Sequence, residues 1–152
     1  MDNDSPSLQP QTGLQMLQAM INSQAGIPIG ETLQFTLAHV EPGRAVFRAT
    51  PGQHAYNPVG IVHGGYAATL LDSACGCAVH ASLDANQAYT TLELKVAYHK
   101  AITTQTGPME AEGKVVSIGR RVAFAEARLV DAQGRLYASA TSTLLLYEAR
   151  PT

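Results

Sequence analysis

Residues 64–83 read GGYAATLLDSACGCAVHASL, and Asp72 is the single charged side chain among them. Their apolar residues lie all round a helical wheel, which is typical of a buried helix rather than a surface helix. Gly76 would cost about 1 kcal/mol relative to Ala unless another element approaches the backbone closely there. The stretch therefore predicts one long central helix at about Gly64–Leu83.

The segments on both sides of this helix have the patterns of β-strands. The turn Glu41-Pro42-Gly43-Arg44 separates two expected strands, because Pro and Gly are typical turn residues. Further along, Leu92, Leu94, Val96 and Tyr98 alternate with other residues and are expected on one face of a strand. The full set of predicted strands is 33–40, 45–50, 91–98, 110–118, 121–130 and 136–147.

One predicted strand has a face of small side chains, formed by Ala123, Ala125, Ala127 and Leu129. Such a face lets the central helix lie close against the sheet. The predicted fold class is α+β, an antiparallel sheet of five or six strands wrapped around the buried helix. A short amphipathic helix with Leu14, Leu17, Met20 and Ile21 precedes them and ends before Gly26.

The 152 residues have the length of one domain. We expect residues 1–12, which are polar and contain two prolines, to be a flexible tail, and residues 13–149 to form the domain. A content of 45% hydrophobic and 14% charged residues excludes disorder. The net charge of -2 disfavours a nucleic-acid partner. No apolar run is long enough to predict a membrane span.

The low charge content and the cysteines bear on assembly and location. Ordinary domains carry about 25% charged residues, and the shortage here is compatible with subunit interfaces or with an Ala-rich genome. Cys75 and Cys77 are too close along a helix to pair, and the chain has no other cysteine. The N-terminus is acidic, unlike that of a signal peptide. Together with the two unpaired cysteines, this predicts a reduced, cytoplasmic protein.

Asp72 is the unusual residue of the predicted central helix. An isolated carboxylate in a buried helix costs several kcal/mol if it has no partner. Asp is also a poor residue for a helix interior, because its side chain competes for backbone hydrogen bonds. Two interpretations are open: a carboxylate at a wet edge or paired with a distant Arg, or a base or nucleophile in a cleft.

The segment Asn57-Pro58-Val59-Gly60-Ile61-Val62-His63-Gly64-Gly65 leads into this helix. Two glycines leave the first turn without side chains, where backbone N–H groups have no intrahelical partners. At the positive end of the helix dipole, such groups suit an anion or a developing oxyanion. Taken alone, the His-Gly-Gly tripeptide is more typical of a tight helix entry in which His63 is only the N-cap.

Gly64 and Asp72 are eight residues apart, which is about 12 Å along a helix. An oxyanion donor and a carboxylate that act on one carbonyl group must both lie within about 4 Å of the reacting atoms. One helix cannot supply both groups to one substrate, whereas two antiparallel copies can. If both residues are catalytic, the protein is at least a two-fold dimer with two shared sites.

Residues 33–147 resemble the hotdog-fold acyl-CoA thioesterases. The resemblance rests on Asn57, then His63-Gly64-Gly65 and Asp72 at these spacings, opening a buried helix that strands follow. The chain is most similar to the phenylacetate-degradation thioesterases, which are related to the 4-hydroxybenzoyl-CoA thioesterases. The segment Ser117-Ile118-Gly119-Arg120-Arg121 also resembles the family's strand turn near the coenzyme.

The resemblance implies a role for each of these residues. The Gly64 N–H polarises the thioester carbonyl, and Asp72 of the partner subunit attacks it or activates a water. Asn57 and His63 position the thioester or the water, and Thr91 helps to hold the water, although an ordinary strand Thr is an equally good interpretation. The substrate and coenzyme contacts that it implies are Gly65, Arg120 and Arg121. Some relatives have Glu in place of Asp72, or Thr in place of Gly76, so both routes of attack stay open.

The sequence therefore predicts an acyl-CoA thioesterase that converts an aryl- or medium-chain acyl-CoA to the free acid and CoA. No metal or cofactor is expected, because coenzyme A is part of the substrate. We expect a homodimer at least, with a homotetramer open. Two alternatives remain: an acyl-thioester hydratase or dehydratase on the same fold, which would need His63 in the cleft, and a non-catalytic acyl-CoA-binding module.

Overall fold

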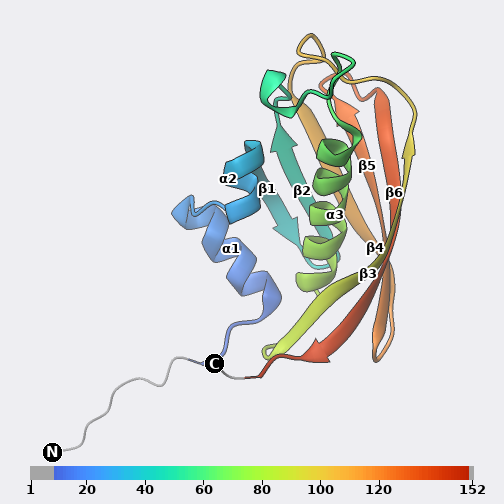
Figure 1. Ribbon diagram of the computed structural model, residues 1–152. Coiled ribbons are helices and arrows are strands. Elements are labelled where there is room, and N and C mark those ends of the chain that lie inside the picture. Colours follow the sequence, from blue (N-terminus) through green and yellow to red (C-terminus); the bar gives the residue numbers. More distant parts are fainter. Residues whose placement is uncertain (1–8, 151–152) are drawn as a thin grey trace, which may run out of the picture.

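The computed structural model describes residues 9–150, so residues 1–8 of the predicted tail lie outside the described part. Figure 1 shows one long helix, α3, lying against one face of a curved sheet, with two shorter helices beside β1. The helices are α1 (Gly13–Ser23), α2 (Pro28–Leu33) and α3 (Gly64–His80). The strands are β1 (Phe35–Glu41), β2 (Arg44–Ala49), β3 (Gln87–Tyr98), β4 (Met109–Ile118), β5 (Val122–Asp131) and β6 (Leu136–Glu148).

The strands form one six-stranded antiparallel sheet in the order β1-β2-β4-β5-β6-β3. This confirms the predicted α+β class and the central helix, which ends at His80 rather than Leu83. Both cysteines lie buried on α3 as free thiols, and burial raises the pKa of each to about 12. None of the helices within residues 9–150 has the length and apolar character of a membrane span.

The helix lies close to the sheet because the strands beneath it carry small side chains. Ala123, Ala125, Ala127 and Leu129 are at most 2% exposed, as predicted for this face of β5. On β4, a Cβ added to Gly113 would lie only 2.2 Å from the Ala74 carbonyl oxygen of α3. Small residues on two adjacent strands therefore set the depth at which α3 sits.

Helix α2 was not predicted from the sequence, which placed Leu33 in the first strand. Pro28 opens this helix at a position that proline favours, because its missing N–H has no intrahelical partner there. Gln34 then ends the helix with a left-handed φ of 63°, and β1 begins at Phe35. The predicted N-terminal helix is confirmed as α1, whose capping box joins Thr12 and Gln15.

A β-bulge in β3 changes the predicted face of this strand. Thr91 pairs with Leu144 and Glu93 pairs with Thr143, so Leu92 is the extra residue. The extra residue reverses the alternation of side chains, and Thr91 and Leu94 consequently both face α3. The prediction that Leu92 shares a face with Leu94 is therefore wrong, and Leu92 is 58% exposed.

Asp131 at the end of β5 is a buried carboxylate, only 4% exposed. It accepts hydrogen bonds from the backbone N–H groups of Gln133 and Arg135, from Arg135 Nε at 2.7 Å and from the Tyr137 hydroxyl. Burial by itself raises the pKa of this carboxyl, but the hydrogen bonds from Arg135 and Gln133 outweigh it and lower the pKa below its ordinary value.

We expect this carboxylate to make the protein acid-sensitive. Because the folded-state pKa is lowered, the stabilisation is complete above the pKa of the unfolded chain, about 4, and is lost as the pH falls through the folded-state value. Urea unfolding of wild type and Asp131→Asn should give a difference in free energy that is largest near neutral pH and shrinks in acid. A difference that is constant with pH would contradict this.

Candidate active site

The first turn of α3 presents a free backbone donor at Gly64. His63 is the N-cap, and its Nδ1 accepts the Gly65 N–H at 2.8 Å, while its carbonyl accepts the Tyr66 N–H at 3.0 Å. Within residues 9–150 the Gly64 N–H meets no acceptor. The positive end of the α3 dipole lies at the same place. This donor is therefore suited to a carbonyl oxygen on which negative charge develops.

The cap also fixes the protonation of the His63 ring. Because Nδ1 accepts a backbone hydrogen bond, the neutral ring must carry its proton on Nε2. In this tautomer His63 offers a donor from Nε2 and has no free basic nitrogen. The ring can orient a ligand by donating a hydrogen bond from Nε2, while Nδ1 is occupied by the helix cap.

Gly64 lines a cavity of about 610 Å³. Its walls are Asn57, residues 61–65 and Ala67 on one side and residues 98–102 on the other. Asn57 builds the loop on the first side, because its Oδ1 accepts the Val59 and Ile61 N–H groups at 3.1 and 3.3 Å. The structure thus brings the predicted residues Asn57, His63, Gly64 and Gly65 to one cavity.

Two residues of the opposite wall were not singled out from the sequence. The Tyr98 hydroxyl donates to the Gly64 carbonyl at 2.7 Å, and a Cβ on Gly64 would lie 3.0 Å from that hydroxyl oxygen. Lys100 places its ammonium 5.5 Å from the centroid of the Tyr137 ring. Neither residue belongs to a local motif. The only signal in the sequence was that Tyr98 lies on the predicted apolar face of strand 91–98, at the end of that strand.

Asp72 lies two helical turns further along α3 and does not border this cavity. The carboxylate is partly buried, and its Oδ1 accepts the Thr91 hydroxyl at 3.0 Å. Among the described residues, no Lys, Arg or His forms an ion pair with it. Asp72 is therefore a carboxylate oriented by Thr91 rather than one neutralised by a distant Arg.

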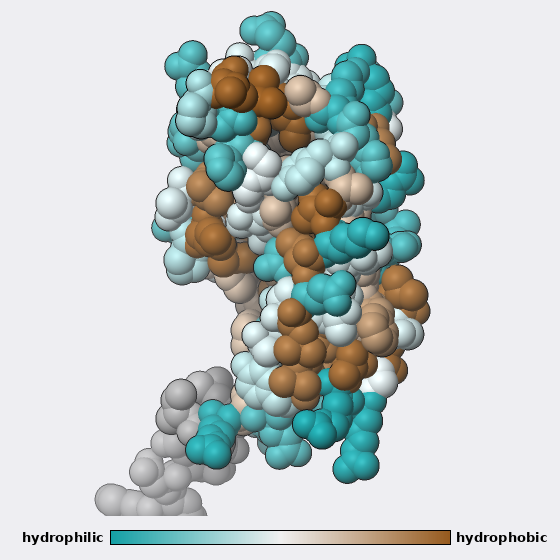
Figure 2. All heavy atoms as spheres, turned by 45° about the vertical axis from the view of Figure 1, so that its right-hand side comes forward, coloured by the Kyte–Doolittle hydropathy of each residue, from teal (hydrophilic) through white to brown (hydrophobic). Residues whose placement is uncertain are grey.

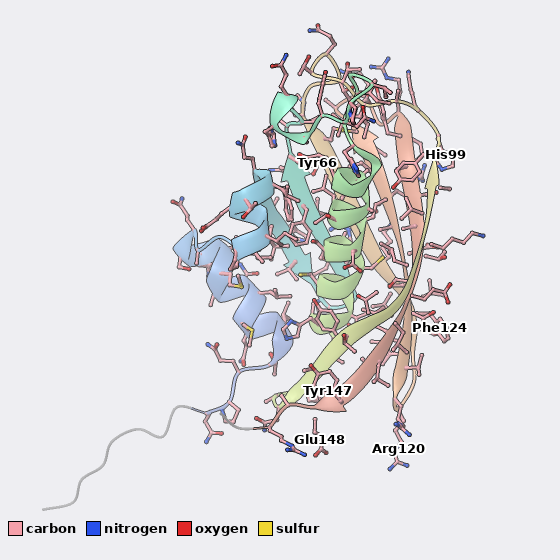
Figure 3. The ribbon with its side chains drawn as sticks, in the orientation of Figure 1. Tyr66, His99, Arg120, Phe124, Tyr147 and Glu148 are labelled. Atoms are coloured by element: carbon pink, nitrogen blue, oxygen red, sulfur yellow. The ribbon has the colours of Figure 1, made fainter. Side chains whose placement is uncertain are left out.

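Arg120 and Arg121 are exposed at the turn between β4 and β5. Figure 3 places Arg120 at the opposite end of the molecule from His99, which borders the cavity. Within one chain, the structure therefore does not bring these arginines to Gly64. No group of three or more potential metal ligands occurs in the described part of the chain.

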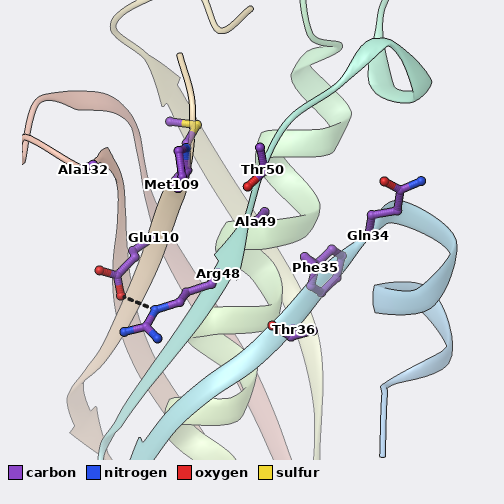
Figure 4. Close-up of a pocket in the computed structure, with 10 residues that line it drawn as sticks. Gln34, Phe35, Thr36, Arg48, Ala49, Thr50, Met109, Glu110 and Ala132 are labelled. Carbon is purple, nitrogen blue, oxygen red and sulfur yellow. Dashed lines mark hydrogen bonds and ion pairs between the residues drawn. The ribbon is translucent and has the colours of Figure 1, made fainter. Parts of the chain in front are cut away.

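A second hollow, of about 440 Å³, crosses β1, β2 and β4 (Figure 4). The guanidinium at its rim is already paired, with Arg48 Nε 3.3 Å from Glu110 Oε2. None of the predicted site residues borders this hollow. The candidate active site is thus the cavity at the start of α3, together with the Asp72–Thr91 pair.

Comparisons with known proteins show the family and the fold of this chain. Residues 59–138 match the family model of the thioesterase superfamily. A 1,4-dihydroxy-2-naphthoyl-CoA hydrolase of Listeria monocytogenes is 25% identical over 120 residues, which cover 79% of this chain and 96% of the relative. The hotdog fold predicted from the sequence is confirmed, whereas the phenylacetate-type subfamily stays a prediction.

Two solved structures show the same fold. A thioesterase family protein from Silicibacter pomeroyi superposes with a TM-score of 0.78 at 25% identity, over 90% of this chain and 99% of its own. A hypothetical thioesterase from Streptococcus pneumoniae, solved with coenzyme A, superposes with a TM-score of 0.69 at 24% identity, over 77% and 91% of the two chains.

Proposed function

Because the chain belongs to the thioesterase superfamily, we propose that this thioester hydrolase converts an aryl- or medium-chain acyl-CoA to the free acid and coenzyme A. The observation that carries the proposal is the unpartnered Gly64 N–H in a cavity, on the same helix as the oriented carboxylate of Asp72. The naphthoyl-CoA hydrolase and the coenzyme A complex among the similar proteins support an acyl-CoA substrate.

In the proposed mechanism, the Gly64 N–H binds the thioester carbonyl oxygen and stabilises the oxyanion, an effect of about 3 kcal/mol for one donor. Asp72 takes a proton from a water, whose oxygen bonds to the carbonyl carbon. The tetrahedral intermediate then expels the CoA thiolate, which takes up that proton. In the alternative route the carboxylate attacks first, expelling the thiolate, and a water then hydrolyses the anhydride. Both routes require a water beside Asp72.

Both groups can reach one substrate only if two subunits share each site. Eight residues of the continuous helix separate Gly64 from Asp72 by about 12 Å. β3 ends the sheet order, so no strand of the described residues covers its outer edge. Such an edge is a template for pairing with another chain. Figure 2 shows exposed apolar side chains on this side of the molecule. On β3 itself, Leu92 is exposed.

The contacts of β3 with α3 support the proposal of a shared site. Thr91 contacts Asp72, and Tyr98 at the end of the same strand contacts Gly64. If two β3 strands pair antiparallel about a two-fold axis between these points, the Gly64 cavity of one subunit comes to face the carboxylate of the other. We therefore propose a homodimer at least.

Mixed dimers test the shared site. Gly64→Pro removes the donor and Asp72→Asn removes the base, so we expect each variant alone to be nearly inactive. Random reassociation makes half of the dimers mixed, and each mixed dimer has one intact site of two. Thiol release should therefore recover to about a quarter of the wild-type rate. Mixed dimers, verified by differently tagged chains, that recover no activity would contradict the shared site.

Lys100 is expected to bind the anionic coenzyme. Lys100 lines the cavity, and removing one exposed charge pair costs up to about 1 kcal/mol. Lys100→Ala should therefore raise KM for acyl-CoA about three- to fivefold with little change in kcat. Lys114→Ala is the matched control, because Lys114 pairs with Glu112 on β4 away from the cavity. An unchanged KM in Lys100→Ala would remove Lys100 from the binding site.

The protonation of His63 favours hydrolysis over the hydratase alternative. A hydratase needs an acid/base pair at the α and β carbons, whereas His63 Nδ1 is occupied by the helix cap. The products separate the two reactions, because hydrolysis releases a free thiol and hydration changes the absorbance of a double bond. We expect thiol release from a panel of acyl-CoA esters.

A further inference from the structure

Besides the contact of Tyr98 with Gly64, helix α3 and strand β3 meet at two successive points near Asp72. At the first, the Thr91 hydroxyl donates to Asp72. At the second, Tyr89 of the strand lies against Gly76 of the helix. Tyr89 precedes Thr91 by two residues, and Gly76 follows Asp72 by one helical turn. A Cβ added to Gly76 would be 2.7 Å from the Tyr89 hydroxyl oxygen and 2.8 Å from its Cε2. The Tyr89 hydroxyl therefore occupies the space of a side chain one turn from Asp72.

The Tyr89 hydroxyl does not stabilise the fold through a hydrogen bond in the described part of the chain. No residue between 9 and 150 forms a hydrogen bond with it, yet the ring is partly buried and packs against His80, with ring centroids 5.5 Å apart. The oxygen still reaches the surface, so a water can approach it. Burial, and after it the neighbouring Cys77 and Asp72, raise the pKa of this hydroxyl, which keeps it uncharged beside the carboxylate.

The spacing fits one bridging water. Side chains one helical turn apart have Cβ atoms about 5–6 Å from each other. A single water that donates to two oxygens spans about 4.5 Å, because each bond is about 2.8 Å long and the two O–H bonds diverge by about 105°. The carboxylate oxygens extend beyond the Asp72 Cβ, so they can come within this span of a hydroxyl one turn along the helix. The Asp72 carboxylate has a second oxygen besides the one that Thr91 occupies. That oxygen and the Tyr89 hydroxyl can therefore hold the same water.

We propose that Tyr89 is a further positioning residue, whose hydroxyl holds the attacking water together with Asp72. The proposal rests on the proposed hydrolysis, in which both routes need a water at this place. The water donates one hydrogen to Asp72 and the other to the Tyr89 oxygen, so that a lone pair faces the carbonyl carbon. Tyr89 itself neither gains nor loses a proton in the reaction.

The first experiment removes only the hydroxyl. Tyr89→Phe keeps the ring over Gly76 and against His80. We expect kcat to fall about tenfold, the equivalent of one lost hydrogen bond, with KM and the melting temperature unchanged. Tyr147→Phe is the matched control, because this tyrosine is on β6 and 48% exposed, and it should keep wild-type kcat. A Tyr89→Phe enzyme with wild-type kcat would overturn the proposal.

A second pair of variants moves the hydroxyl from the strand to the helix. Tyr89→Ala opens the space over position 76, which Gly76→Ser or Gly76→Ala can then fill. These two double variants differ by one oxygen atom. We expect the Ser variant to recover part of the lost kcat and the Ala variant to recover none. Equal kcat values in the two double variants, at equal stability, would show that Tyr89 acts only through packing and would overturn the proposal.

Asp72→Asn, assayed beside these variants, separates this proposal from the proposed function. If Asp72→Asn is inactive and Tyr89→Phe is fully active, hydrolysis at Asp72 stands and the role of Tyr89 fails. If Asp72→Asn keeps wild-type activity, the proposed site fails, and the role of Tyr89 fails with it.

Discussion

Replacing Asp72 by Asn should lower kcat for acyl-CoA hydrolysis at least about 100-fold, because the change removes the base or nucleophile. Asn has nearly the same shape, and its side-chain oxygen can still accept the Thr91 hydroxyl that now meets Asp72 Oδ1. We therefore expect the fold and the melting temperature to be preserved. The measurement is thiol release from a panel of acyl-CoA esters, with wild type and variant side by side.

Asp84→Asn is the matched control for this substitution. Asp84 is exposed in the segment between α3 and β3, and its side chain makes no hydrogen bond within residues 9–150. The same change of charge there should leave kcat unaltered. If Asp72→Asn hydrolyses esters as fast as wild type, the carboxylate is not part of the site. If wild type binds acyl-CoA but releases no thiol from any ester, a binding module becomes the better interpretation.

Replacing Gly64 by Pro should lower kcat by a factor of about 100 to 1,000, the cost of one oxyanion donor. Proline has no N–H, and the first position of a helix tolerates it. The preceding residue, His63, has a ψ of 135°, which is the range required before a proline. We therefore expect the helix to form and the donor alone to be lost.

Gly64→Ala separates the donor from the steric effect. It keeps the N–H and adds the same Cβ, which would lie 3.0 Å from the Tyr98 hydroxyl oxygen. Tyr98 is 56% exposed and can shift by the small amount required. We expect the Ala variant to keep much more activity than the Pro variant. Equal losses in both variants, measured by thiol release, would mean that the space at Gly64 matters and its N–H does not.

Local patterns in the sequence were sufficient for the main elements. The apolar residues all round α3 predicted a buried helix, and this is confirmed. The face of small side chains on β5 predicted the contact of this helix with the sheet, which is also confirmed. The turn residues Pro42 and Gly43 also predicted the pair of strands around them, and β1 (Phe35–Glu41) and β2 (Arg44–Ala49) begin and end within two residues of the predicted 33–40 and 45–50. Helix α2 was not predicted, because its six residues are too few for a helical period to be distinguished from the pattern of the adjoining strand.

The sequence by itself determined how far apart two of the predicted site residues lie. The spacing from Gly64 to Asp72 depends only on helix geometry, so the prediction that both residues can be catalytic only in a shared site followed before any tertiary contact was known. What only the tertiary structure decided is which strand residues meet the helix. Thr91 reaches Asp72 because the bulge at Leu92 reverses the alternation of β3, and Tyr98 and Tyr89 reach Gly64 and Gly76 from the same strand. These contacts depend on strand register and on packing between segments distant in the chain, and neither leaves a local pattern in the sequence.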